Sequence, residues 1–183
     1  MTSADPALAA LLDSRIRDVP DYPKPGVLFK DIAPLLADAE AFAALTRALA
    51  DRARALGATK VVGLEARGFV LAAPAAFAAG LGFVPIRKAG KLPGEVFRKS
   101  YDLEYGSATL EVQCDAFAPG EKVLVVDDVL ATGGTIGASV DLVRQAGVEL
   151  VGVVVLMELG FLPGRERLLP HLGGAPLETL VTV

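Results

Sequence analysis

The sequence predicts an α/β fold with a parallel sheet flanked by helices, and three observations support it. Apolar segments of strand length alternate with helical patterns between residues 60 and 156, which is typical of a parallel sheet with crossover helices. Residues 123–126 are four apolar β-formers, as expected for a strand buried on both faces. The chain has 183 residues, 52% of them hydrophobic and 22% charged, without repeats or a linker. We therefore expect one globular domain over residues 1–183.

Composition excludes several classes of protein. The net charge is −4 and no long run of Lys and Arg occurs, which argues against nucleic acid as a partner. The single cysteine, Cys114, cannot form an internal disulfide, and with the single histidine, His171, it cannot complete a structural zinc site. Residues 1–10 lack the basic region of a signal peptide. These features predict a cytoplasmic protein.

Two helices and a proline-rich segment are predicted before the first sheet strand. Ser3 can cap a helix that has Pro6 in its first turn. Residues 18–36 contain several prolines and turn signals, which indicates an ordered loop of the kind that often carries binding groups. Phe29, within it, contacts either the core or a ligand. Residues 39–56 have the apolar period of a second helix.

An uncharged segment, residues 68–86, follows a short apolar strand at residues 60–64. It is long enough to cross a bilayer, but Pro74 and several glycines interrupt it. We interpret it as a buried helix, a glycine turn and a buried strand, and we expect no membrane span. Arg67 then lies just after the carboxyl end of a strand, where ligands bind in open parallel sheets.

A cationic stretch comes next, broken by glycines and prolines, and we expect a loop over residues 89–100. Its cations are Arg87, Lys88, Lys91, Arg98 and Lys99. Such runs are usually solvated, but beside a phosphate site a loop of this kind could also bind a second anion and close over a substrate.

The rest of the chain supplies a hairpin and the last elements of the sheet. Alternation over residues 101–113 predicts a hairpin that turns at Gly106. Beyond the central strand and its helix, we expect a buried strand at 150–156, a short helix at 160–169 and a last strand at 177–183.

The segment Val123–Thr135 predicts a binding site. Asp127 and Asp128 end its strand, and a loop of small residues precedes a helix; the loop residues are Ala131, Thr132, Gly133, Gly134 and Thr135. Such a loop directs backbone N–H groups at one point near the positive end of the helix dipole, which favours a phosphate. The carboxylates would repel a bare phosphate but suit a ligand with hydroxyls or a metal ion. The combination indicates a sugar phosphate.

This segment resembles the phosphoribosyl-pyrophosphate (PRPP) signature of the type I phosphoribosyltransferases. Four further blocks are similar to the same family, in the same order and spacing, at residues 22–32, 63–69, 86–94 and 103–106. The resemblance implies the fold of that family, with a small N-terminal hood, mainly residues 18–36, and a flexible β-hairpin loop. It also implies a non-proline cis peptide between Glu65 and Ala66.

The resemblance further implies the activity. The 5-phosphoribosyl group of PRPP would pass to adenine, giving AMP and pyrophosphate in purine salvage, with Mg²⁺ as cofactor and a homodimer as the assembly. No metal ligand on the chain is assigned. The loop 131–135 would bind the 5′-phosphate, and Asp127 and Asp128 the ribose hydroxyls.

The same resemblance gives roles to the other site residues. Pyrophosphate would be neutralised by Arg67, Arg87, Lys88 and Lys91, some of them across the dimer interface. Adenine would stack on Phe29 and be recognised by the backbone of Leu28 and Lys30. Glu104 and Tyr105 would close over the site, with Glu104 as the general acid or base.

Two residue patterns bear on the choice of base. The hood block usually has arginine where this chain has Lys30, and the two side chains are not equivalent if the side chain itself binds. In the similar enzymes that act on hypoxanthine and guanine, a lysine well downstream of the PRPP loop recognises the 6-oxo group. No lysine occurs after Lys122 here, so the resemblance implies a 6-amino purine, adenine. The alternatives are a phosphoribosyltransferase for xanthine or guanine, or a non-catalytic PRPP-sensing regulator on the same fold.

Overall fold

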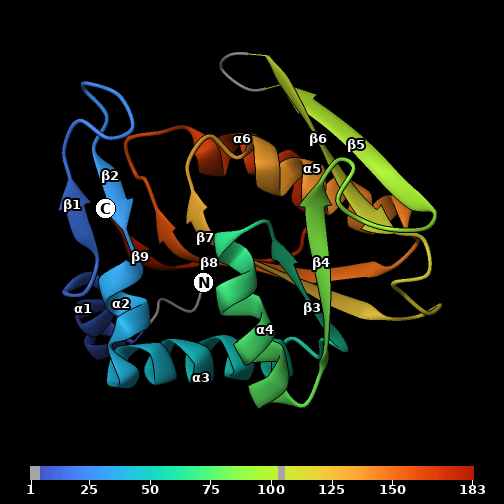
Figure 1. The fold of residues 1–183 in the computed structure, drawn as a ribbon. Coiled ribbons are helices and arrows are strands. Elements are labelled where there is room, and N and C mark those ends of the chain that lie inside the picture. The colour runs from blue at the N-terminus through green and yellow to red at the C-terminus, as the bar shows by residue number, and fades with distance from the viewer. Residues whose placement is uncertain (1–4, 103–105) are drawn as a thin grey trace.

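The structure is a computed structural model, and it describes residues 5–102 and 106–183. Within that part of the chain a seven-stranded sheet lies between two layers of helices, and a smaller two-stranded sheet lies beside it (Figure 1). The strands of the large sheet, in spatial order, are β5 (Val96–Asp102), β6 (Ser107–Gln113), β4 (Gly82–Lys88), β3 (Lys60–Leu64), β7 (Lys122–Leu130), β8 (Glu149–Glu158) and β9 (Leu177–Thr182). The helices are α1 (Pro6–Asp13), α2 (Ala33–Ala37), α3 (Ala39–Ala55), α4 (Arg67–Ala79), α5 (Gly134–Gln145) and α6 (Gly164–Leu172).

The predicted parallel α/β sheet is confirmed. Strands β4, β3, β7, β8 and β9 are mutually parallel, and β6 and β5 add an antiparallel edge. Neighbouring residues of β7 enter opposite cores: Leu124 and Val126 pack with α1, α3 and α4, while Val123 and Val125 pack with α5 and α6. Burial on both faces explains why this strand is a continuous apolar run.

The two N-terminal helices are present, but the first has a different cap. Helix α1 begins at Pro6, and the carboxylate of Asp5 accepts a hydrogen bond from the Ala7 amide at 3.0 Å. The prediction that Ser3 caps this helix is therefore wrong, because Asp5 already occupies the N-cap. Helix α3 ends one residue before the predicted end, with Leu56 as its C-cap.

The proline-rich segment is more regular than the predicted loop. Strand β1 (Arg17–Val19) pairs with β2 (Phe29–Asp31) in an antiparallel sheet, and α2 follows. Two ion pairs cross this sheet, Arg17 to Asp31 at 2.5 Å and Lys30 to Asp18 at 2.7 Å. Strands of three residues are too short to show a period of two, so the sequence pattern did not indicate them.

The uncharged segment forms the helix, turn and strand that we predicted. Helix α4 contains Pro74 and ends at Ala79. Its C-cap, Gly80, adopts the left-handed conformation (φ 73°) that glycine tolerates, and β4 begins at Gly82. No helix in the described part of the chain is long and apolar enough to cross a membrane.

The hairpin is confirmed, but its first strand begins earlier than expected. Strand β5 pairs with β6 from Val96, opposite Gln113, to Asp102, opposite Ser107. The prediction of a loop over residues 89–100 is therefore wrong for residues 96–100, because cross-strand pairing orders them. Arg98 and Lys99 belong to this strand. Helix α6 also begins four residues later than predicted, at Gly164.

Candidate functional site

A cavity of about 210 Å³ lies at the carboxyl ends of the adjacent strands β3 and β7. Residues from two separate segments line it: Glu65, Ala66 and Arg67 after β3, and Asp127, Asp128, Val129 and residues 131–136 at the end of β7. The structure thus brings together Arg67, the acid pair and the whole predicted phosphate loop. This is the edge of a parallel sheet at which ligands bind.

Close backbone packing shapes the phosphate loop. Gly133 has φ +85°, and a Cβ atom there would lie 2.7 Å from the carbonyl oxygen of Gly164. No other residue fits both the conformation and the space. Helix α5 begins at the next residue, Gly134. The loop therefore lines the cavity at the N-terminus of α5, the positive end of the helix dipole, an arrangement suited to a phosphate.

The acid pair lies beneath this loop and is almost fully buried. Asp127 is 8% exposed and Asp128 is 4% exposed. Burial, and then the adjacent charge of Asp128, raises the pKa of Asp127 well above its usual value. Burial also raises the pKa of Asp128, although the Arg67 cation opposes this. The two carboxyl groups therefore hold protons more tightly than exposed carboxyl groups do. Hydrogen-bond donors from a ligand would oppose this effect.

Arg67 connects the acid pair to the hood. Its Nε atom lies 2.9 Å from Oδ2 of Asp128, and its guanidinium carbon lies 5.2 Å from the centre of the Phe29 ring. The edge of Tyr22 packs on the same ring, with centroids 5.1 Å apart. Phe29, for which the sequence left core and ligand contacts open, therefore lies next to the site.

Lys30 directs its side chain elsewhere. Its ammonium group forms the 2.7 Å ion pair with Asp18 on the neighbouring strand of the hood. Leu28, the residue before Phe29, is 47% exposed. The side chain of Lys30 is therefore engaged within the hood.

Glu65 is a residue of the site that the sequence reasoning missed. Its carboxylate accepts a hydrogen bond from the Lys88 amide at 2.9 Å, lies 3.4 Å from Nε of Arg87, and binds the ammonium group of Lys91. Burial raises the pKa of Glu65, but the hydrogen bonds from Lys91 and Lys88 outweigh it, so the pKa is lowered overall. The peptide between Glu65 and Ala66 is cis, as expected.

The other two cations of the stretch have partners away from the cavity. Arg98 binds the buried Glu111 at 2.6 Å, and Lys99 binds Asp141 of α5 at 2.8 Å. Strand β5 also reaches the phosphate loop, since the Tyr101 hydroxyl lies 3.1 Å from Oγ1 of Thr135. The predicted catalytic residues Glu104 and Tyr105 lie outside the described residues.

The acid pair is the best-placed candidate for a metal contact. In the described part of the chain, no group of three or more His, Cys, Asp or Glu could hold a metal ion alone. Oδ2 of Asp128 is buried and accepts no hydrogen bond, its contact with Arg67 being ionic. Mg²⁺ is commonly held by one or two carboxylates together with substrate phosphates, and this donor set fits that pattern.

Comparisons with known proteins agree with this geometry. Residues 33–168 match the family described as phosphoribosyl transferase domain. The chain is 67% identical to an adenine phosphoribosyltransferase of Streptomyces coelicolor, over 96% of this chain and 97% of that protein. The crystal structure of adenine phosphoribosyltransferase from Rhodothermus marinus is 44% identical, with a TM-score of 0.89, and the match covers 98% of this chain and all of that one.

A second solved structure, adenine phosphoribosyltransferase of Saccharomyces cerevisiae, is similar over 95% of this chain and 98% of its own, with 40% identity and a TM-score of 0.88. It was solved with adenine and an imino-altritol bisphosphate.

Proposed function

Because the chain belongs to the phosphoribosyltransferase family, we infer that it transfers the 5-phosphoribosyl group of PRPP to adenine, giving AMP and pyrophosphate in purine salvage. It is a transferase, and its substrates are small molecules. The observation that carries the assignment is the buried acid pair directly beneath a backbone phosphate loop. A sugar phosphate is the ligand class that offers a phosphate to one and hydroxyl groups to the other.

We assign one anion of PRPP to the phosphate loop of the cavity and the other to the cations around Glu65 at its margin. The loop 131–135 binds the 5′-phosphate, and Asp127 and Asp128 accept hydrogen bonds from the ribose hydroxyls. Arg67, Arg87, Lys88 and Lys91 receive the pyrophosphate. The position of Glu65 supports this division, because its carboxylate already binds the side chains of Arg87 and Lys91 and the backbone amide of Lys88 around one anionic group.

The base lies between the hood and the hairpin in this proposal. Adenine stacks on Phe29, and the backbone of Leu28 and Lys30 binds its edge. The contact of Arg67 with the Phe29 ring supports the placement, because it puts that ring beside the ribose site. The absence of lysine after Lys122 supports a 6-amino purine over hypoxanthine, guanine or xanthine.

The reaction separates charge, and the site is arranged to stabilise that charge. As pyrophosphate leaves C1′, positive charge grows on the ribose, close to the two buried carboxylates. The cations beside Glu65 stabilise the negative charge of the leaving group. Glu104, with Tyr105 beside it, transfers the purine ring proton as the general acid or base.

Mg²⁺ fits this site as a cofactor shared between protein and substrate. Bound there, it would neutralise charge on the pyrophosphate. Asp127 and Asp128 are the residues that would hold it, together with oxygens of PRPP, since the two carboxylates alone give too few ligands. The cytoplasm is the compartment we propose, supported by the acidic composition and the single cysteine.

The exposed face of α4 supports a homodimer. Val70 is 43% exposed and Phe77 is 87% exposed, and their separation of seven residues places both on one face of the helix. Arg67 is the first residue of the same helix. A second copy packed on this face would bury these side chains and bring cations of one protomer near the site of its partner.

The decisive experiment is a base screen. AMP formation from adenine and PRPP is expected in the presence of Mg²⁺ and is expected to stop when the metal is chelated. Hypoxanthine, guanine and xanthine should give rates lower by about 10⁴-fold, because a site that hydrogen-bonds one pattern rejects another. Glu104→Gln provides a control with an intact phosphate site.

A preference for a 6-oxo purine would refute the adenine assignment. PRPP binding without any product, in every base tested, would favour the non-catalytic regulator.

A further inference from the structure

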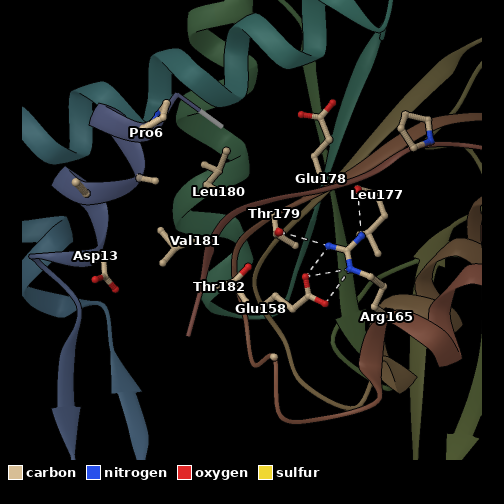
Figure 2. A pocket seen from close by; sticks show the side chains of 14 residues that line it. Pro6, Asp13, Glu158, Arg165, Leu177, Glu178, Thr179, Leu180, Val181 and Thr182 are labelled. Carbon is tan, nitrogen blue, oxygen red and sulfur yellow. Dashed lines mark hydrogen bonds and ion pairs between the residues drawn. The ribbon is translucent and has the colours of Figure 1, made fainter. Parts of the chain in front are cut away.

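Arg165, which is partly exposed, and the buried Glu158 form a bidentate ion pair outside the substrate cavity. Nε of Arg165 donates to both carboxylate oxygens of Glu158, at 2.9 and 3.1 Å, and Nη2 donates to Oε2 at 2.5 Å. The guanidinium also reaches Oγ1 of Thr179 at 3.3 Å and the carbonyl oxygen of Leu177 at 3.5 Å (Figure 2). The pair therefore joins β8, β9 and the start of α6 at one point.

One member of this pair is adjacent to the wall of the phosphate loop. Gly164, the residue before Arg165, packs backbone against backbone on Ala131, and a Cβ atom on Gly164 would lie 2.0 Å from the Ala131 carbonyl oxygen. The carbonyl of Gly164 in turn limits the space at Gly133. If the first turn of α6 moves, then either the loop 131–135 moves with it or the contact between Gly164 and Ala131 is lost.

The other member is tied to the strand from which the loop emerges. Glu158 lies opposite Leu130 in the register of β7 and β8, and Leu130 is the residue before Ala131. The amide of Leu159 also donates to the carbonyl of Leu130 at 3.0 Å. The ion pair thus connects the strand on one side of the loop to the backbone wall on its other side.

We propose that Arg165 and Glu158 are positioning residues for the 5′-phosphate of PRPP, acting through Gly164 on the loop 131–135. The proposal rests on the assignment of that loop to the 5′-phosphate. Neither side chain lines the substrate cavity; both line a separate groove of about 1110 Å³ between α1 and β9 (Figure 2). Their effect on phosphate binding is therefore indirect, through the fixed distance between Gly164 and the loop.

For positioning the first turn of α6, the bidentate geometry of the Arg165–Glu158 pair matters more than its charge. Three hydrogen bonds to Glu158 and two further acceptors hold the guanidinium in one orientation, whereas a lysine ammonium would bind a single oxygen. Arg165→Lys keeps the buried carboxylate of Glu158 neutralised but releases the orientation of the first turn of α6. This variant tests positioning without leaving an unpaired buried charge.

The test compares two ligands that occupy different halves of the site. Ribose 5-phosphate carries the 5′-phosphate, and pyrophosphate represents the other anion; binding of each is measured by calorimetry on the full chain. In Arg165→Lys and Glu158→Gln, affinity for ribose 5-phosphate and 1/KM for PRPP should fall by about 10-fold to 100-fold, as expected when a binding group is displaced by about 1 Å. Pyrophosphate affinity and KM for adenine should stay at the wild-type values.

Arg167→Lys, an exposed arginine on the same helix, is the matched control and should change neither ligand. Equal weakening of both ligands, unchanged binding in folded variants, or failure of both variants to fold would overturn the proposal, the last by marking the pair as purely structural. Failure of the proposed function would show differently, because the wild-type chain would then not bind ribose 5-phosphate.

Discussion

The two halves of the site to which we assign the two anions of PRPP are built in different ways. The 5′-phosphate half consists of backbone packed on backbone, with Gly133 and Gly164 in contact and a buried acid pair below. The pyrophosphate half consists of long, partly exposed side chains, Arg87 and Lys91, that are gathered by the carboxylate of Glu65. The first half is fixed by the sheet and its helices, whereas the second is held by ion pairs that an incoming anion can exchange.

Gly164→Ala should have the largest effect, and it should act on the 5′-phosphate half of the site. The added Cβ would lie 2.0 Å from the Ala131 carbonyl oxygen, so the phosphate loop must move. We expect kcat/KM for PRPP to fall by about 100-fold or more. The unfolding free energy should fall by about 1–3 kcal/mol, as for other overpacked positions.

Gly82→Ala is the control for this change, since its Cβ would make only ordinary contacts with Lys60. Steady-state kinetics and thermal unfolding of both variants give the comparison. Wild-type PRPP kinetics in a folded Gly164→Ala variant would show that the loop tolerates displacement. The 5′-phosphate half would then not be more rigid than the pyrophosphate half.

Asp127→Asn should show that the buried carboxyl group of Asp127, in the rigid half of the site, lowers the unfolding free energy. The raised pKa means that, between the usual value of 3.8 and the folded value, the folded chain binds more protons than the unfolded chain. The unfolding free energy therefore decreases as pH rises through that interval. Asparagine removes this loss, so the variant should be more stable than the wild type above the interval and not below it.

Denaturant unfolding over a pH series measures this effect, with the exposed Asp115→Asn as control. Activity of Asp127→Asn should fall even as stability rises. An identical pH dependence of stability in Asp127→Asn and the wild type would contradict the destabilising role assigned to the buried acid.

Glu65→Gln should have the smallest effect, and this effect should be confined to the pyrophosphate half of the site. Without the carboxylate charge, Arg87 and Lys91 no longer need to leave an internal partner when pyrophosphate binds. Because partly exposed ion pairs contribute about 0.2–1 kcal/mol, pyrophosphate affinity should rise by about 2-fold to 5-fold at low salt. Calorimetry should show unchanged ribose 5-phosphate binding; weaker pyrophosphate binding would mean that Glu65 orients the cations instead.

The sequence predicted the rigid half well because its signals are local. The apolar run, Asp127, Asp128 and the glycine loop are consecutive, and the structure places them as that order implies. Contacts that join distant segments were not predictable in this way. Glu65 contacts Lys91, which is 26 residues later in the chain, and Gly164 at the start of α6 packs on Ala131 of the loop. No sequence pattern in these segments indicates either contact.

Short elements and exchangeable side chains were also difficult to predict. Strands β1 and β2 have three residues each, and their antiparallel pairing shows only in three dimensions. Arg98 and Lys99 carry the same charges as the cations near the cavity, yet pairing with β6 directs them to Glu111 and Asp141. The roles of Glu104 and Tyr105 stay predictions.

The side-chain-poor loop at residues 131–134 has a consequence for redesign. If the 5′-phosphate binds main-chain amides there, as we propose, point substitutions have few side chains to exchange, and a new sugar phosphate would require a differently shaped backbone. The base, by contrast, is proposed to meet Phe29 and the neighbouring hood, where side chains are available for replacement. Attempts to broaden the chemistry of this enzyme by mutagenesis should therefore begin with the acceptor base and leave the phosphoribosyl donor as it is.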